Sequence, residues 1–345
     1  MGLYNGAIKL KAYFGSFKAK NMYLGATKLW SGIREIVYRS YDRTISMSYM
    51  GAAKANDDYC VLVGGIGTNR AYAFNTSLVS SRLADINDLN LTMWFSQGSG
   101  KVGDYLVFAG GNANNNPQSG TNLVVAYNKT LVKSSPTGTG TGYGTQNSGG
   151  SMEGYFLNAG YGVIDVYNPF LVKTAIASLF GYTMHPSVAY SNDACIVTGA
   201  YGANGAAQSI TKNLVKTLLA NLSSAKWSCG CANAGGNYLI GPGNTQSNVV
   251  DVYNKDFVKT ANVLLGVSDA TVNGANIDEK GVFYCGLYNT ALYQFDENLV
   301  RTTLTNPNRG GSGAALCQFN DKMVISTKYD GSAEGYTTVD FYNLV

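Results

Sequence analysis

Histidine is almost absent from this chain: His185 is the only one in 345 residues. A metal centre with several histidine ligands is therefore excluded. Aspartate and glutamate together number 21, and this scarcity argues against the paired carboxylates that a glycosidase needs. The residues thus give no basis for a bound metal, and we expect no cofactor.

Long apolar runs and strong charge are missing as well. No stretch approaches the ~18–20 apolar residues of a membrane-spanning helix, so we expect no membrane insertion. Residues 1–12 lack the continuous apolar core of a signal peptide, which predicts a protein made in the cytoplasm without one. Charged residues make up only 13% of the chain and the net charge is +4, too small and too dispersed to indicate a nucleic-acid partner.

The six cysteines do not follow a disulfide or zinc pattern. They lie inside apolar, strand-like segments, and Cys229 and Cys231 have a C-x-C spacing that is neither the usual zinc spacing nor the thioredoxin spacing. We therefore expect reduced, buried thiols at Cys60, Cys195, Cys229, Cys231, Cys285 and Cys317.

What the chain does contain is a repeat. Asp165–Thr174 is DVYNPFLVKT and Asp251–Thr260 is DVYNKDFVKT. Further copies are FNTSLVSS from Phe74, YNKTLVKS from Tyr127, and the weaker ITKNLVKT from Ile210 and FDENLVRT from Phe295. The residue before the valine recurs at positions 78, 131, 171, 214, 257 and 299, with intervals of 53, 40, 43, 43 and 42. Such self-similarity indicates one supersecondary unit repeated along the chain.

Two further strands are predicted before each copy. The nearer one is apolar and often ends in glycine, as in YLVFAGG from Tyr105 and ACIVTG from Ala194, and seven such segments can be counted. The earlier one is more variable, as in LTMWFSQG from Leu91, PSVAYS from Pro186 and AKWSCGCA from Ala225. Four short strands in roughly 40–45 residues is the period of a propeller blade, so we predict an all-β, seven-bladed β-propeller. Asn254 is predicted to cap the tight turn before the last strand through its side chain.

The unit of apolar strand, diglycine, loop and Tyr-Asn strand resembles the kelch repeat from about Ile36 to Val345. It departs from a typical kelch repeat because the last strand lacks tryptophan. The YNxxLVKT spelling is similar to that of kelch-like propellers in bacteriophage and prophage tails of Gram-positive hosts. The resemblance implies a tail-fibre, baseplate or tailocin component, made in the bacterial cytoplasm and located in the virion.

The last unit of the repeat is incomplete. It contains GAALCQF, DKMVIST and TTVDFYNLV and stops at Val345, before a fourth strand. Arg34–Tyr41 resembles that missing strand, because Ile36 and Val37 match the Leu-Val pair and Arg39 roughly matches the lysine. We predict that this segment supplies the outer strand of the last blade and closes the ring. The predicted domains are an attachment module at 1–32 and a propeller at 33–345.

A basic residue recurs in the last strand of the repeat, at Lys133, Lys173, Lys216, Lys259 and Arg301. One interpretation is a basic belt for anionic polymers. The interpretation we favour from the sequence is that lysines on an exposed edge discourage strand addition by other chains.

Residues 1–32 carry a different, shorter repeat: LYNGAIKLK, AYFGSFKAK and MYLGATKLW. Aromatic residues followed by Gly turns predict short hairpins, and about 30 residues cannot build a core alone. The segment resembles Tyr/Gly-repeat segments of phage tail and virion proteins, which implies attachment to other tail or baseplate proteins through Tyr4, Tyr13, Tyr23 and Trp30. The alternative is that it packs against the side of the propeller itself.

The connections on one face of the predicted propeller vary widely, whereas the turns on the other are short and uniform. Variable loops on one face of a scaffold are where binding usually lies. Their Asn, Ser, Tyr and Gly content suits hydrogen bonding and aromatic stacking, so host surface carbohydrate is a candidate ligand. The candidate binding residues are Asn114, Asn115, Asn116, Tyr143, Tyr201, Asn308, Arg309, Tyr329 and Tyr336.

The sequence argues against an enzyme. A copper radical oxidase on this fold needs two histidines, the Ser-x-Asp-x-Gly-x-Thr-Trp boxes of propeller sialidases are missing, and His185 is expected to be a loop or rim residue rather than a base. We predict a non-enzymatic recognition component of a phage or tailocin particle. The alternatives are a cytoplasmic kelch-type protein-interaction scaffold and, last, a propeller glycan hydrolase or lyase.

Overall fold

The computed structural model describes most of the chain. The described residues are 13–14, 17–18, 21–24, 27–31, 34–42, 52–64, 70–86, 98–110, 122–138, 148–160, 162–177, 186–198, 205–226, 229–243, 248–267, 272–286, 290–307, 314–328 and 337–345. No helix occurs among them, and so none that is long and apolar enough to cross a membrane.

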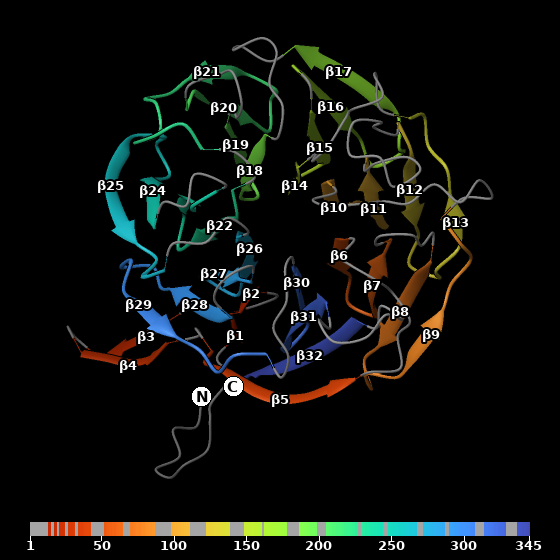
Figure 1. The fold of residues 1–345 in the computed structure, drawn as a ribbon, viewed down its shortest axis with the longest axis horizontal. Coiled ribbons are helices and arrows are strands. Elements are labelled where there is room, and N and C mark those ends of the chain that lie inside the picture. The colour runs from red at the N-terminus through yellow and green to blue at the C-terminus, as the bar shows by residue number, and fades with distance from the viewer. Residues whose placement is uncertain are drawn as a thin grey trace.

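Seven four-stranded antiparallel sheets stand in a ring around a central axis, which confirms the predicted seven-bladed propeller (Figure 1). Blade 1 contains β6 (Ala52–Ala55), β7 (Tyr59–Val63), β8 (Ala71–Asn75) and β9 (Ser80–Arg82). Blade 2 contains β10 (Gly98–Val102), β11 (Tyr105–Ala109), β12 (Val124–Tyr127) and β13 (Lys133–Ser134), and blade 3 contains β14 (Ser148–Met152), β15 (Tyr155–Gly160), β16 (Val163–Tyr167) and β17 (Lys173–Ala177). Blade 4 contains β18 (Ser187–Tyr190), β19 (Ala194–Thr198), β20 (Ala207–Thr211) and β21 (Lys216–Leu218).

The remaining three blades follow the same order. Blade 5 contains β22 (Cys231–Ala234), β23 (Asn237–Ile240), β24 (Val249–Tyr253) and β25 (Lys259–Leu264), and blade 6 contains β26 (Val272–Ile277), β27 (Lys280–Cys285), β28 (Ala291–Phe295) and β29 (Arg301–Thr303). Blade 7 contains β30 (Ala314–Phe319), β31 (Lys322–Lys328), β32 (Thr337–Leu344) and β5 (Ile36–Asp42). The first strand of each blade lies nearest the axis and the fourth at the rim (Figure 1).

Strand β5 closes the ring as predicted. It pairs antiparallel with β32 from Leu344↔Ile36 to Val339↔Asp42. The register places Tyr38, opposite Tyr342, where Lys259 stands opposite Tyr253 in blade 5. The match of Arg39 to the repeated lysine was therefore wrong by one residue: Tyr38 takes the position, and its hydroxyl lies 3.3 Å from Oδ1 of Asp340.

The hydrophobic core lies between neighbouring blades rather than in one central mass. Each cluster draws side chains from two adjacent sheets, and the Phe74 ring of blade 1 meets the Phe341 ring of blade 7 edge to face at 5.3 Å between centroids. Because each blade is covered on both faces by its neighbours, the second and third strands are buried almost throughout. The blades consequently stabilise one another around the ring.

Two innermost strands differ from the prediction. The first strand of blade 2 is Gly98–Val102 and not LTMWFSQG from Leu91, and the first strand of blade 5 begins at Cys231, beyond most of AKWSCGCA. The reason is steric: a Cβ on Gly98 would lie 2.1 Å from Oδ1 of Asn158, and one on Gly149 would lie 2.7 Å from the Gly98 Cα. Near the axis close approach selects glycine, so apolar content is a poor guide to these strands.

The turn between the third and fourth strands has one construction in five blades. The Asn254 side-chain oxygen accepts hydrogen bonds from the backbone N–H groups of Asp256 and Val258, which confirms the predicted cap. Asn75, Asn128, Asn168 and Asp296 make the equivalent pairs of bonds. The residue before the valine is left-handed in six blades, with φ between 59° and 64° at Leu78, Leu131, Leu171, Leu214, Phe257 and Leu299. The repeated residues therefore specify the turn between the third and fourth strands.

The repeated tyrosine and lysine bind consecutive backbone carbonyls of the preceding blade. In blade 3 the Tyr167 hydroxyl donates to the Thr137 carbonyl at 3.1 Å and the Lys173 ammonium donates to the Gly138 carbonyl at 2.7 Å. Tyr127 and Lys133 bind Ala84 and Asp85 in the same way, Tyr253 and Lys259 bind Ala220 and Asn221, and Tyr342 binds Thr305. We call these the tyrosine–lysine contacts.

These contacts add a role for the lysines that neither interpretation included. The ammonium groups of Lys133, Lys173 and Lys259 donate to backbone carbonyls of the neighbouring blade. Their stems cover the joint between two blades while the charged ends donate to these carbonyls.

Replacing Tyr167 with phenylalanine removes one of these bonds and leaves the packing unchanged. We expect a loss of about 1 kcal/mol in the free energy of unfolding, measured by urea titration, because the Thr137 carbonyl then lacks its donor. Tyr155→Phe is the matched control, since the described residues offer its hydroxyl no hydrogen-bond partner. Equal stability of the two variants would contradict a stabilising role for the tyrosine–lysine contacts.

The N-terminal residues form two small hairpins. Strands β1 (Tyr13–Phe14) and β2 (Phe17–Lys18) pair with each other, and β3 (Asn21–Leu24) pairs with β4 (Thr27–Ser31). The second and third Tyr/Gly repeats are therefore hairpins, as predicted. Tyr4 lies outside the described residues, and the domain boundary at residue 32 stays a prediction.

Candidate functional site

The predicted binding residues lie outside the described residues, but the strands that carry their connections are placed. The segments concerned are 111–121, 139–147, 199–204, 308–313 and 329–336. Each joins a second strand to a third, or a fourth strand to the first strand of the next blade. All five therefore leave from the same end of the ring, which we call the loop face. The opposite end, which carries the Asn turns, is the turn face.

One buried amide has no partner beneath the loop face. The side chain of Asn158 in β15 has no solvent exposure, and neither its Nδ2 nor its Oδ1 makes a hydrogen bond. It is the one side chain of the described residues whose two amide atoms are both buried and unpaired. A buried polar group without a partner costs free energy, so an unpaired amide in a folded protein requires an explanation.

The position of Asn158 is apolar in the other six blades. The strand registers make it equivalent to Leu62, Phe108, Val197, Ile240, Phe283 and Ile325. Because the other six blades have an apolar residue at this position, the fold does not require an amide there. Sequence reasoning missed Asn158, although an alignment of the seven repeats would have shown one Asn among large apolar residues.

Asn158 lies at the joint between blades 2 and 3. The Gly98 backbone of β10 touches its amide, and Asp165 is its partner across the sheet on β16. The connections 111–121 and 139–147, which contain Asn114, Asn115, Asn116 and Tyr143, begin and end on blades 2 and 3. The unpaired amide and the two connections that contain these four predicted binding residues therefore belong to the same pair of blades.

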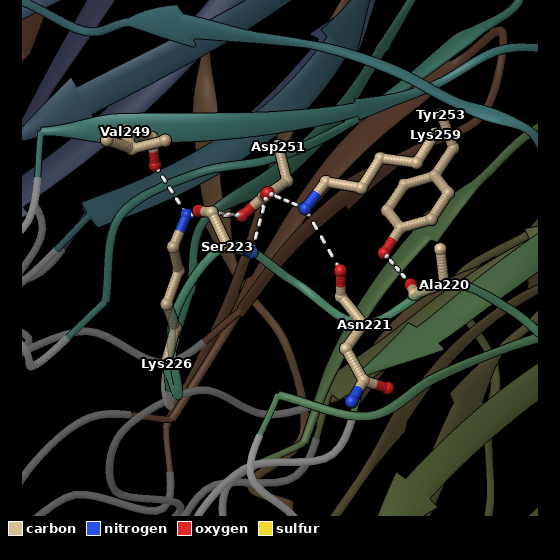
Figure 2. A network of polar contacts seen from close by, with 8 residues as sticks. All are labelled: Ala220, Asn221, Ser223, Lys226, Val249, Asp251, Tyr253 and Lys259. Carbon is tan, nitrogen blue, oxygen red and sulfur yellow. Dashed lines mark hydrogen bonds and ion pairs between the residues drawn. The ribbon is translucent and has the colours of Figure 1, made fainter.

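A second polar cluster, at the joint between blades 4 and 5, is fully paired (Figure 2). The Asp251 carboxylate, buried on β24, is 2.6 Å from the ammonium of Lys226 and 2.8 Å from that of Lys259. It also accepts hydrogen bonds from the backbone N–H and the hydroxyl of Ser223. We call these four residues the Asp251 cluster.

The electrostatics of the Asp251 cluster fix its charge state. Burial alone would raise the pKa of Asp251, but hydrogen bonds from Lys226 and Lys259 outweigh it and hold the pKa below its usual value. The ammonium of Lys226, fully buried, also donates to the Val249 carbonyl at 2.6 Å. A lysine used as a nucleophile must be reachable, and the Lys226 side chain is fully buried, so the cluster serves to join two blades.

Side chains from three blades make contact across the axis of the ring. The Lys54 ammonium of blade 1 donates to the Tyr190 hydroxyl of blade 4 at 2.8 Å and lies over its ring. Asn276 of blade 6 donates to the Tyr190 carbonyl at 2.9 Å. Three blades thus meet through Tyr190. Over the part of the chain that the structure places, no group of three metal-binding side chains occurs, and all six cysteines are free thiols.

Comparison with known proteins identifies the fold. No family model matches the chain, and no curated protein matches it. Among solved structures, virginiamycin B lyase from Staphylococcus aureus superposes with a TM-score of 0.64 at 10% identity, covering 89% of this chain and 99% of the lyase. A streptogramin B lyase gives 0.63 at 10% identity over 90% and 97% of the two chains, and a chain of the mitotic checkpoint complex gives 0.62 at 12% over 100% and 99%.

These similarities correct one prediction. The lyases are enzymes built on the same propeller, so they contradict the expectation that this chain is not an enzyme. At 10–12% identity the comparisons show the fold alone. The kelch and phage-tail resemblances rest on the sequence and stay predictions.

Proposed function

We propose that this protein is a recognition component of a phage or tailocin particle, whose loop face binds carbohydrate of the host surface over blades 2 and 3. Asn158 carries the proposal: its buried amide has a donor nitrogen and an acceptor oxygen, neither of which has a partner among the described residues. A sugar hydroxyl is both acceptor and donor, and therefore complements such an amide. The connections 111–121 and 139–147, which begin and end on the same two blades, contain further amides and Tyr143, which suit sugar edges and faces.

The N-terminal hairpins support the attachment half of the proposal. Tyr13, Tyr23 and Trp30 lie in β1, β3 and β4, so the repeated aromatic positions coincide with hairpin strands. Isolated two-stranded hairpins are marginally stable in water and gain stability against another surface. Other tail or baseplate proteins are the partners that the sequence resemblance implies.

Asn158→Leu tests the ligand site directly. Leucine has the branching of asparagine and restores the apolar character of the other blades, so the melting temperature should stay the same or rise. Binding of the full chain to purified wall carbohydrate of a Gram-positive host, measured by isothermal titration calorimetry, should weaken about tenfold on losing one buried hydrogen bond.

Val197→Asn is the matched control, because it places an amide at the equivalent position of blade 4. It should lower stability by about 1–3 kcal/mol and leave carbohydrate binding unchanged. Undiminished binding by Asn158→Leu would refute a ligand role for this amide. If the full chain binds no wall carbohydrate but co-purifies with a cellular protein, the scaffold alternative replaces the recognition proposal.

Lyase activity is the second candidate, and the fold comparison favours it. One of the matching structures is a catalytically inactive histidine-to-alanine variant of virginiamycin B lyase with quinupristin, which superposes with a TM-score of 0.65 over 89% of this chain. This chain has a single histidine, His185, just before β18. Consumption of quinupristin that disappears in His185→Ala would establish this function in place of recognition alone.

A further inference from the structure

Two thiols face each other where the last blade meets the first. The Sγ atoms of Cys60, on β7 of blade 1, and Cys317, on β30 of blade 7, are 3.3 Å apart. The two residues are 257 positions apart in sequence, and both are buried. Their separation is that of a thiol–thiol hydrogen bond and exceeds the ~2.05 Å of a disulfide by little more than one ångström.

The pairing is specific to this joint. The strand registers make Cys317 equivalent to Gly100 and Gly150, and Cys60 equivalent to Phe156 and Cys195. Gly100 faces the Phe156 ring, so these two positions meet between blades 2 and 3 as they do between blades 7 and 1. Between blades 3 and 4 the position of Cys317 is taken by Gly150, which has no side chain and lies against Tyr190. Cys195 therefore has no thiol at the matching position, although it is as buried as Cys60. It serves as an internal control.

We propose that Cys60 and Cys317 form an oxidisable cross-link site, at which a peroxide joins blade 1 to blade 7 by a disulfide. Hydrogen peroxide oxidises one thiol to a sulfenic acid and is itself reduced to water. The second thiol then attacks the sulfenic sulfur: the S–O bond breaks, the S–S bond forms, and the oxygen leaves as a second water. Two thiols lose two electrons and two protons in all, and one peroxide accepts them.

The geometry gives the cross-link a structural consequence. Without it, the ring is closed by the pairing of β5 with β32 and by packing between the blades. A Cys60–Cys317 bond ties the ends of a loop that passes through every blade, so the ring stays closed even when β5 separates. Cross-linking such a distant pair restricts the unfolded chain strongly. This inference is independent of the proposed function.

Burial determines how the site reacts. The hydrogen bond with Cys317 and burial both raise the pKa of Cys60, and burial raises the pKa of Cys195. Cys60 and Cys195 therefore react slowly, since the thiolate is the reactive form. A small neutral oxidant enters a packed joint more readily than a bulky disulfide, so hydrogen peroxide is the appropriate probe.

The experiment treats the folded full chain with hydrogen peroxide, removes the peroxide, then unfolds, alkylates and digests the protein. Mass spectrometry should show the Cys60 and Cys317 peptides linked, with a loss of about 2 Da relative to two free thiols. The melting temperature should rise by roughly 5 °C and return to its starting value with dithiothreitol. The Cys195 peptide should be recovered alkylated and unlinked.

Cys60→Ala and Cys317→Ala are the test variants, and each should lose both the linked peptide and the reversible rise in melting temperature. If one fails to fold, the other still decides. Recovery of Cys60 and Cys317 from the treated wild-type chain as alkylated thiols or as sulfinic acids would overturn the proposal. A reversible rise that survives in Cys317→Ala would overturn it equally.

Discussion

A chain that begins at residue 43 is expected to aggregate instead of folding, whereas a chain that begins at residue 33 should fold like the full protein. The shorter chain lacks β5 and leaves β32 as an unpaired edge in a ring whose other six blades are complete. An exposed, largely apolar edge pairs readily with other chains. Size-exclusion chromatography and circular dichroism of the two chains provide the measurement.

The contacts of β5 show why the effect should be large. Ile36 is buried among side chains of blades 6 and 7, and Tyr38 packs edge to face on Tyr342 at 5.2 Å between ring centroids. Burial and the Asp340 carboxylate raise the pKa of Tyr38 to about 12, so its phenol stays a donor at neutral pH. Several kcal/mol of hydrogen bonds and burial are removed at once, a large part of the 5–15 kcal/mol that stabilises a typical protein.

The contacts of Arg34 explain why the longer chain should begin at residue 33. Its guanidinium and backbone N–H bind the Asp278 carboxylate in the turn between β26 and β27 of blade 6, and Glu35 exchanges two backbone hydrogen bonds with Val345. These contacts fix the start of β5 and lie within the chain that begins at residue 33. A monomeric, cooperatively unfolding chain from residue 43 would contradict a closing role for β5.

The features found from the sequence are those that the fold uses repeatedly. The turn capped by Asn254, with Phe257 in the left-handed conformation, recurs in several blades. So do the contacts that Tyr167 and Lys173 make with the preceding blade. A repeated contact selects the same residues each time, and so leaves a pattern that can be counted. The same count showed that the last unit, which ends at Val345, lacks a fourth strand, because the regular spacing of the repeat predicts one there.

The features missed are those used once. The pairing of Cys60 with Cys317 depends on a closed ring, and Lys226 lies in AKWSCGCA, whose pattern predicts a strand and not a buried ion pair. Gly98 was missed for another reason: close approach to Asn158 excludes any side chain there, whereas strand propensity favours bulky residues. Asn158 cannot be recognised from its neighbours in the sequence. It stands out only against the six apolar residues at the equivalent positions of the other blades.

The tyrosine–lysine contacts explain how a regular ring can carry irregular loops. They hold the carbonyls of Thr137 and Gly138 just before the connection 139–147 leaves the loop face, and those of Ala84 and Asp85 just after β9. Where these contacts occur, the connection from a fourth strand to the next blade is thus fixed at its start by the repeated residues. Beyond that point the length and content of a connection can change without affecting the joint between the blades.

Asp251→Leu is expected to destabilise the protein by about 3–5 kcal/mol at pH 7, because it leaves the fully buried ammonium of Lys226 without a counter-charge. Lys226→Met combined with Asp251→Leu should cost clearly less than Asp251→Leu alone, since both members of the buried pair are then apolar. Asp104→Ala is the control: its ion pair with Lys129 is exposed, so the cost should stay below about 1 kcal/mol. Urea titration measures all three variants.

The same cluster predicts a dependence on pH. The pKa of Asp251 is lowered in the folded state, so its stabilising contribution is complete above the usual aspartate pKa of about 3.9 and is lost as the pH falls through the lower, folded value. The stability difference between wild type and Asp251→Leu should therefore be constant from about pH 6 to 8 and narrow below about pH 4.

A double variant as unstable as Asp251→Leu would show that the carboxylate does not stabilise the buried Lys226. In that case the joint between blades 4 and 5 would depend on Tyr253, Lys259 and packing alone.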